Sequence, residues 1–257
     1  MLDENKIQEN WLKLREMVNT EFSGERADNL NRLYDYFEER MILAPASGKE
    51  HFHNAFPGGY VDHVLRVIDL SLKEMELWQS AGAIINFTRE ELVFSAMHHD
   101  LYKVGDLDND YYIPNDSQWH TEKQGLIYAF NPELEHTPGH LQTQYLLQYF
   151  NVYCSKREMI AIQCADGMYS TDAESILKQY EASRQLRSNL PLILHHADML
   201  ASRVEYDTWY ASKSTIIEQK EEVKKPVTFK KQNLSKLSSI AENATTEAQR
   251  KLFDDLF

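Results

Sequence analysis

Histidine and aspartate occur together at two places in this sequence, each within an apolar segment. The triplet HHD, residues 98–100, ends the segment ELVFSAMHHD, and HHAD, residues 195–198, lies within LPLILHHADML. A further histidine, His63, follows the glycine pair 58–59 at the start of an apolar helical pattern. Burying such groups without partners costs several kcal/mol, and one shared metal ion would satisfy all of them. Imidazole and carboxylate together favour Mn, Fe, Zn, Ni or Co over Ca.

Each of these features also has a simpler explanation. A single histidine on a helix is often a hydrogen-bonded core residue, and a histidine at a helix end is favoured by the helix dipole. Asp198 is harder to explain in this way, because aspartate is rarely buried without a partner and this one lies in a strongly apolar segment.

Most of the chain has apolar residues three and four positions apart, the spacing of amphipathic helices. One such stripe begins near Tyr60, and two capping boxes, Thr88 with Glu91 and Ser155 with Glu158, mark helix starts. Alternating strand patterns are scarce, and only YYIPND, from residue 111, is expected to be extended. We therefore predict an all-α fold, a helical bundle with a polar C-terminal tail.

The chain is expected to have three parts. Residues 1–44 contain helices that pack on the core, and residues 45–212 form the main domain, beginning with a loop rich in proline and glycine. Residues 213–257 are polar, with few large apolar side chains, and are interpreted as a tail with some helix.

Composition narrows the class of function. The formal net charge is −13, which argues against a protein that binds long nucleic acid through its backbone phosphates. A small phosphorylated substrate is compatible with this charge, because a metal ion supplies local positive charge. The sequence shows no signal peptide and no apolar stretch of ~18 residues. Cys154 and Cys164 form no disulfide framework, so we expect a cytoplasmic protein.

The order of these residues resembles that of the HD-domain metal-dependent phosphohydrolases. The segment HHDLYKVGD, with Lys103, is similar to the HD-x-x-K segment of that family, and FHNAFPGGYVDH is similar to the segment before its first ligand histidine, especially in the bacterial exoribonuclease type. The resemblance covers about residues 45–210. It implies a helical bundle in which His63, His99, Asp100 and Asp198 bind a divalent metal ion (Mn, Mg, Fe, Co, Ni or Zn).

The reaction that the resemblance implies is hydrolysis of a phosphate ester or anhydride by metal-bound hydroxide, since a bound ion lowers the pKa of its water to about 7. Asp100 and Lys103 are the predicted catalytic residues, with Lys103 offsetting charge on the phosphate. A lysine that is merely solvated is the alternative for Lys103.

Other residues are candidates for substrate binding. His53 is expected to face a substrate phosphate or the second metal shell, whereas His51 is expected at the surface. The segment with Asp166 departs from two-metal members of the family, which often have a histidine pair there. We therefore expect one firmly held ion, with a second as the alternative, and Asp166 as a ligand or base. The remaining candidates are His120, His136 and His140 for phosphate or base contacts, and Tyr111, Tyr112 and Trp119 for stacking on a base.

Three functions are compared. The first is a nucleotide phosphohydrolase, and the second is a phosphodiesterase that acts on a cyclic nucleotide or a nucleic-acid 3′ end. The third is a non-catalytic protein in which the metal only holds helices together. The C-terminal peptide KLFDDLF, from residue 251, resembles the short peptides with which replication proteins bind a sliding clamp, although an incidental amphipathic end is the simpler interpretation.

Overall fold

The structure is a computed structural model that describes residues 2–224, with the side chains of residues 2–213. The chain divides into two units after Ala211, and the first comprises Met1–Ala211. The peptide at residues 251–257, for which a sliding-clamp partner was predicted, lies outside the described residues.

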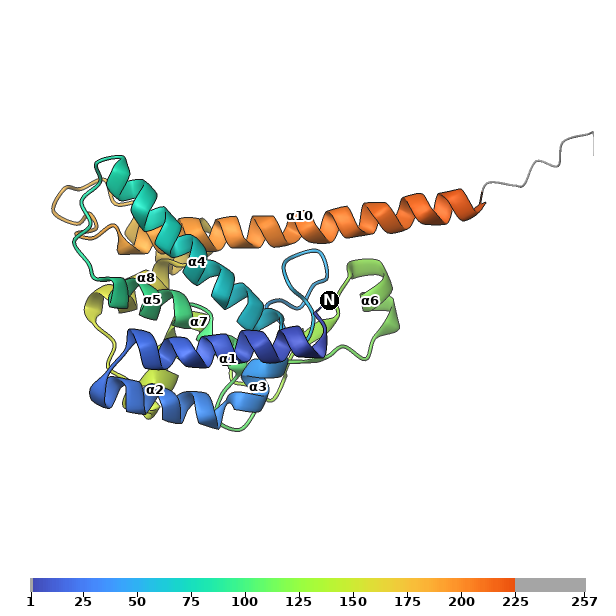
Figure 1. Cartoon of the computed structure of the whole chain (residues 1–257), viewed down its shortest axis with the longest axis horizontal. Helices are drawn as coiled ribbons and strands as arrows, with labels where there is room; N and C mark the ends of the chain where they lie inside the picture. The colour runs from blue at the N-terminus through green and yellow to red at the C-terminus, as the bar shows by residue number, and fades with distance from the viewer. Residues whose placement is uncertain (1, 225–257) are drawn as a thin grey trace, which may run out of the picture. The chain divides into compact units, whose positions relative to one another are not determined.

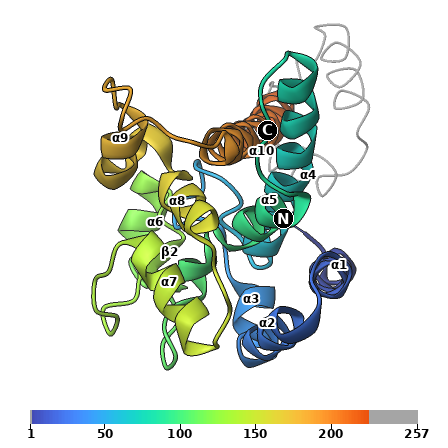
Figure 2. The same ribbon diagram turned by 90° about the vertical axis from the view of Figure 1, so that its left-hand side faces the viewer.

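The N-terminal helices pack on the helix that carries His63. They are α1 (Glu4–Glu21), α2 (Gly24–Tyr36) and α3 (Glu38–Leu43), and α1 and α3 contact α4 (Gly59–Ser80). Figures 1 and 2 show these three helices lying together on one side of α4. Large side chains such as Tyr34, Phe37 and Tyr60 are fully buried there, and burial of each apolar side chain contributes roughly 1.5–3 kcal/mol.

The remaining elements complete the bundle. In chain order they are α5 (Arg89–His98), η1 (Leu101–Val104), β1 (Tyr112–Pro114), α6 (Gln118–Gln124), β2 (Tyr128–Phe130), α7 (Gly139–Tyr149), α8 (Lys156–Cys164), η2 (Gly167–Tyr169), α9 (Thr171–Leu177) and α10 (Leu190–Lys224). Helix α5 packs between α4 and α8. The two strands form one short antiparallel sheet. The segment predicted to be extended, which begins at residue 111, contains strand β1. The prediction of an all-α fold is confirmed.

Local sequence signals account for several helix starts. Thr88 and Glu91 form the predicted capping box of α5, and Ser155 and Glu158 form that of α8, so that each cap satisfies backbone N–H groups left open at a helix start. Helix α10 has 35 residues and continues past the predicted domain boundary at residue 212. The polar sequence there is rich in Glu, Gln and Lys, which favour helix without needing burial. Within residues 2–224, no helix combines the length and the hydrophobicity needed to cross a membrane.

Backbone conformation and steric constraints explain why two glycines, Gly58 and Gly59, stand at the start of α4. Gly58 has a φ of 80°, a left-handed conformation that favours glycine. Gly59 has no such requirement, but a Cβ atom at this position would lie 2.0 Å from the backbone oxygen of Asn54. The loop before α4 therefore passes so close to the helix start that only a residue without a side chain fits at Gly59.

Replacing Gly59 with alanine is expected to destabilise the protein by roughly 2–4 kcal/mol, because the backbone of the 54–58 loop must move to admit the new methyl group. The control is Gly24→Ala, which has a positive φ but no atom within 4 Å of the added Cβ and should cost only about 1 kcal/mol. Urea denaturation of the three proteins measures the difference. Equal losses in the two variants would contradict the steric explanation.

Candidate metal centre

His63 lies on the first turns of α4 and is completely buried. Its Nδ1 lies 3.1 and 3.2 Å from the two carboxylate oxygens of Glu205. Because a carboxylate accepts hydrogen bonds, Nδ1 carries a hydrogen, and Nε2 is the nitrogen that faces the other carboxylates of the site. Nε2 lies 3.1 Å from Asp198 Oδ1 and 3.6 Å from Asp100 Oδ2.

The two adjacent histidines at the end of α5 point to different environments. His98 packs in the core, where its ring contacts Phe94 and its Nε2 lies 3.5 Å from the hydroxyl of Tyr34. The Nδ1 of His99 donates to the backbone oxygen of Ala96 at 2.8 Å, which leaves Nε2 as the atom with the lone pair. This Nε2 lies 3.5 Å from Asp100 Oδ2, so His99, as predicted, is the histidine of the pair that lies near His63.

Asp100 and Lys103 form a buried ion pair beside these imidazoles. Lys103 Nζ donates to Asp100 Oδ2 at 2.6 Å, and both side chains are less than a tenth exposed. The pKa of Lys103 is raised, because the charge of Asp100 outweighs the effect of burial. A solvated lysine, the alternative considered from the sequence, does not describe this side chain.

Helix α10 supplies two carboxylates to the same place. Asp198 Oδ1 lies 3.1 Å from His63 Nε2 and 3.7 Å from His99 Nε2. Glu205 lies seven residues further on, which is two helical turns, and is therefore on the same face. It contacts the other nitrogen of His63, and Arg66 Nε donates to it at 3.0 Å. Sequence reasoning missed Glu205, although its spacing from Asp198 was a usable signal.

The arrangement fits a divalent cation. The ligand atoms of His63, His99 and Asp198 lie within 4.8 Å of one another, as do those of His53, His63 and Asp100. Among the described residues, the Nε2 atoms of these three histidines are buried and have no hydrogen-bond partner. His63 Nε2 lies 3.1 Å from Asp198 Oδ1 and forms an ion pair with it only if the imidazole is protonated. Neighbouring ligands of an ion with bonds of about 2.1 Å lie roughly 3.0–3.4 Å apart, close to the distances found here.

The pKa values show that the site attracts positive charge. Burial lowers the pKa of His63, but Glu205 and Asp198 outweigh it and raise this pKa to about 10. Burial likewise opposes charge on Asp100, yet Lys103 and His99 hold the pKa of its carboxyl well below its usual range. Lone pairs on nitrogen and oxygen converge here, and only protons or a cation relieve their repulsion.

A cavity of about 640 Å³ opens onto this cluster. Asp100, Lys103 and Asp198 line it, together with His53 and Asp166, two of the predicted substrate-binding residues. Partial burial and then the charge of Asp100 raise the pKa of the Asp166 carboxyl. The volume is within the range of cavities that bind small molecules, about 300–1,000 Å³.

The cavity is also lined by His195, one of the histidines singled out in the sequence, and by residues that were not predicted. His195 is fixed by a 2.8 Å contact from its Nδ1 to the backbone oxygen of Ala165. Its ring lies so close to Gly167 that a Cβ there would be 2.0 Å from Cε1. His196 instead packs against Trp78. The further lining residues include Phe52, Tyr169, Arg203 and Tyr206.

Three predicted histidines do not line this cavity. His120 is exposed on α6, where its Nδ1 contacts the hydroxyl of Ser117 at 2.6 Å. His136 is exposed in the loop before α7. His140 is on the first turn of α7, 3.9 Å from Asp172. None of the three lines the cavity that contains Asp100, which sequence order alone does not reveal.

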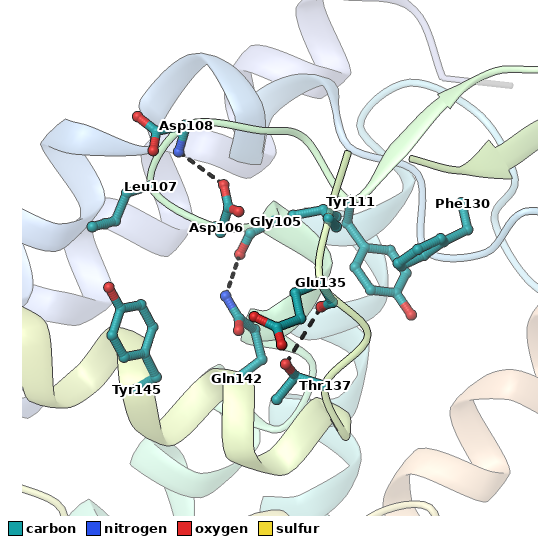
Figure 3. Close-up of a pocket in the computed structure, with 11 residues that line it drawn as sticks. Gly105, Asp106, Leu107, Asp108, Tyr111, Phe130, Glu135, Thr137, Gln142 and Tyr145 are labelled. Carbon is teal, nitrogen blue, oxygen red and sulfur yellow. Dashed lines mark hydrogen bonds between the residues drawn. The ribbon is translucent and has the colours of Figure 1, made fainter. Parts of the chain in front are cut away.

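The predicted aromatic residues also lie elsewhere. Tyr112 lines a different cavity, of about 450 Å³, which shares Lys103 with the first one. Tyr111 also lines a third cavity, of about 400 Å³, where its ring meets that of Phe130 edge to face (Figure 3). That cavity has three carboxylates, those of Asp106, Asp108 and Glu135, and its lining includes no histidine, lysine or arginine. Trp119 is exposed on α6.

The chain matched no known protein family, no curated protein and no solved structure.

Proposed function

We propose that this protein is a metal-dependent phosphohydrolase of the HD-domain type that acts on a small nucleotide. The observation that supports this most strongly is the convergence of His63, His99 and Asp198, from separate helices, beside a cavity. The buried Nε2 atoms of both histidines have no hydrogen-bond partner, which is costly for the folded protein unless protons or a metal cation occupy the cluster.

The cluster of possible metal ligands opens onto the large cavity, and this favours a catalytic metal over a purely structural one. Structural metal sites are closed by protein ligands, whereas catalytic sites keep a position for water or substrate. Here Asp100 and Asp198 both line the large cavity, so a ligand in that cavity reaches the carboxylates directly.

The residues around the cluster suit hydrolysis of a phosphate. A bound divalent ion would lower the pKa of a water molecule and polarise a phosphoryl oxygen. Lys103 and Arg203 line the cavity and place positive charge where a phosphate enters. Asp166, whose pKa is raised, lies at the same wall and is suited to accept a proton from the attacking water.

The rest of the cavity suits a nucleotide base. Phe52, Tyr169 and Tyr206 offer aromatic rings, and stacking of a base on such a ring contributes about 1–3 kcal/mol. The Arg203 guanidinium lies 5.0 Å from the centre of the Tyr206 ring, so a cation and an aromatic surface are adjacent. The acidic net charge of −13 favours a small nucleotide over a long nucleic acid.

A panel of nucleoside mono- and triphosphates and cyclic nucleotides, tested with Mn²⁺, Mg²⁺, Co²⁺ and Ni²⁺, examines this proposal. Metal-free protein is expected to be inactive, and one of these ions should restore release of phosphate or pyrophosphate from at least one nucleotide. A cyclic nucleotide opened to a monoester would instead indicate a phosphodiesterase. Protein that binds metal yet releases no product from any compound would refute hydrolysis and leave a metal-stabilised binding protein.

A further inference from the structure

We propose that His53 is a fifth protein ligand of the same metal ion, beside His63, His99, Asp100 and Asp198. This inference rests on the metal site of the proposed function. It makes His53 a direct ligand, whereas the sequence led us to expect that His53 faces a substrate phosphate or the second metal shell.

The two candidate ligand groups share His63. One contains His53 and Asp100, and the other contains His99 and Asp198. Nδ1 of His63 is held by Glu205, so only Nε2 can bind metal. One nitrogen lone pair binds one ion, so the two groups cannot hold two separate ions through His63, and a single ion at His63 Nε2 lies next to both groups. Opposite ligands of one ion lie about 4.2 Å apart for bonds of about 2.1 Å, so groups within 4.8 Å are close to this geometry.

The loop that carries His53 is fixed in place. The Ser47 hydroxyl donates to the backbone oxygen of His53 at 2.7 Å and accepts from its N–H at 3.4 Å. The next residue, Asn54, donates from its side chain to Asp62 on α4 at 3.0 Å. Gly59 allows this close approach of the loop to the helix. The imidazole of His53 is thus held beside that of His63, with ring centres 4.9 Å apart.

The environment of Nε2 favours a metal over a substrate phosphate. This atom of His53 is buried and has no hydrogen-bond partner, although other parts of the side chain line the cavity. A phosphate in the cavity requires an atom that is accessible from the cavity. His53 instead belongs to a group of possible metal ligands with His63 and Asp100, whose ligand atoms lie within 4.8 Å of one another.

Five protein ligands have a consequence for the ion. Three imidazoles and two carboxylates would together supply the protein ligands of the ion. Such a set favours Mn, Fe, Co or Ni over Zn, which is usually held by four ligands.

Titration of metal-free protein with Co²⁺ tests the inference, because the visible absorption of this ion reports its coordination. His53→Ala is expected to bind Co²⁺ at least about 10-fold more weakly than the wild type, since even loss of an outer-shell partner typically costs 10–100-fold. Its bound spectrum should change and return towards that of the wild type when imidazole is added. His120→Ala, which removes an exposed histidine, is the control and should match the wild type.

The outcomes separate this inference from the proposed function. If the wild type binds Co²⁺ and His53→Ala has the same affinity and spectrum, His53 is not a ligand and the inference fails, whereas the proposed function stands. If the wild type binds no Co²⁺, Mn²⁺ or Ni²⁺, both fail. Circular dichroism checks folding, and if His53→Ala is unfolded, His53→Gln, which keeps a polar side chain of similar length, decides by the same criteria.

Discussion

Replacing Asp100 with asparagine is expected to lower the rate of nucleotide hydrolysis at least about 1,000-fold, which corresponds to about 4 kcal/mol of lost transition-state stabilisation. Asp100 lies between the lysine and the two imidazoles, 2.6 Å from Lys103 Nζ and 3.5–3.6 Å from the Nε2 atoms of His63 and His99. Asparagine keeps the size of the side chain but removes the negative charge that holds both the cation and the lysine.

The same substitution leaves Lys103 buried without a counterion, and breaking such a pair costs about 3–5 kcal/mol of stability. Asp198→Asn is therefore the companion variant, because the ion pair of Lys103 is with Asp100 rather than Asp198, and the Asp198 side chain is 16% exposed. It should lose activity to a similar degree with a smaller loss of stability. Asp69→Asn, on the exposed face of α4, is the control for charge removal. Steady-state kinetics and thermal denaturation measure the effects, and activity within tenfold of wild type in both site variants would contradict the assignment.

Replacing Glu205 with glutamine is expected to weaken metal binding about 10–100-fold, the usual effect of losing a carboxylate that orients a ligand histidine. Glu205 fixes which nitrogen of His63 carries the hydrogen, and its charge makes Nε2 a stronger base. Glutamine can still accept the Nδ1 hydrogen bond but lacks the charge, whereas alanine lacks both. The expected order of affinity is wild type, then Glu205→Gln, then Glu205→Ala.

Comparing the metal affinity with the turnover rate at saturating metal shows whether Glu205 only orients His63 or takes part in the reaction. Glu205 contacts a ligand rather than the cavity, so Glu205→Gln should regain activity within several-fold of wild type when metal is saturating. Asp207→Asn, two residues away and exposed, is the matched control. A Glu205→Gln protein that binds metal normally but turns over slowly at saturation would show that Glu205 takes part in the reaction instead.

Local signals in the sequence were sufficient for much of the fold. The apolar spacing after Tyr60 and the caps at Thr88 and Ser155 marked helices that the structure contains, because helix starts and apolar faces depend on neighbours within a few residues. The extent of α10 was underestimated, because polar residues with high helix propensity do not require a packed partner.

The candidate site was predictable only in part. Resemblance to a family motif selected His99 over His98, and the structure turns His98 into the core against Tyr34. The paths of connecting loops were not predictable, so His120 and Tyr112 were expected near Asp100 although neither lines its cavity.

By itself, the sequence determined which helices carry histidine and aspartate and that these groups lie on apolar faces, because helical periodicity is a local property. Tertiary structure alone decided that His53 reaches His63, that Glu205 holds Nδ1 of His63, and that Tyr169 and Tyr206 line the cavity. The physical reason is that these contacts depend on how a loop docks and how helices are rotated against each other, which is set by packing between segments far apart in the chain.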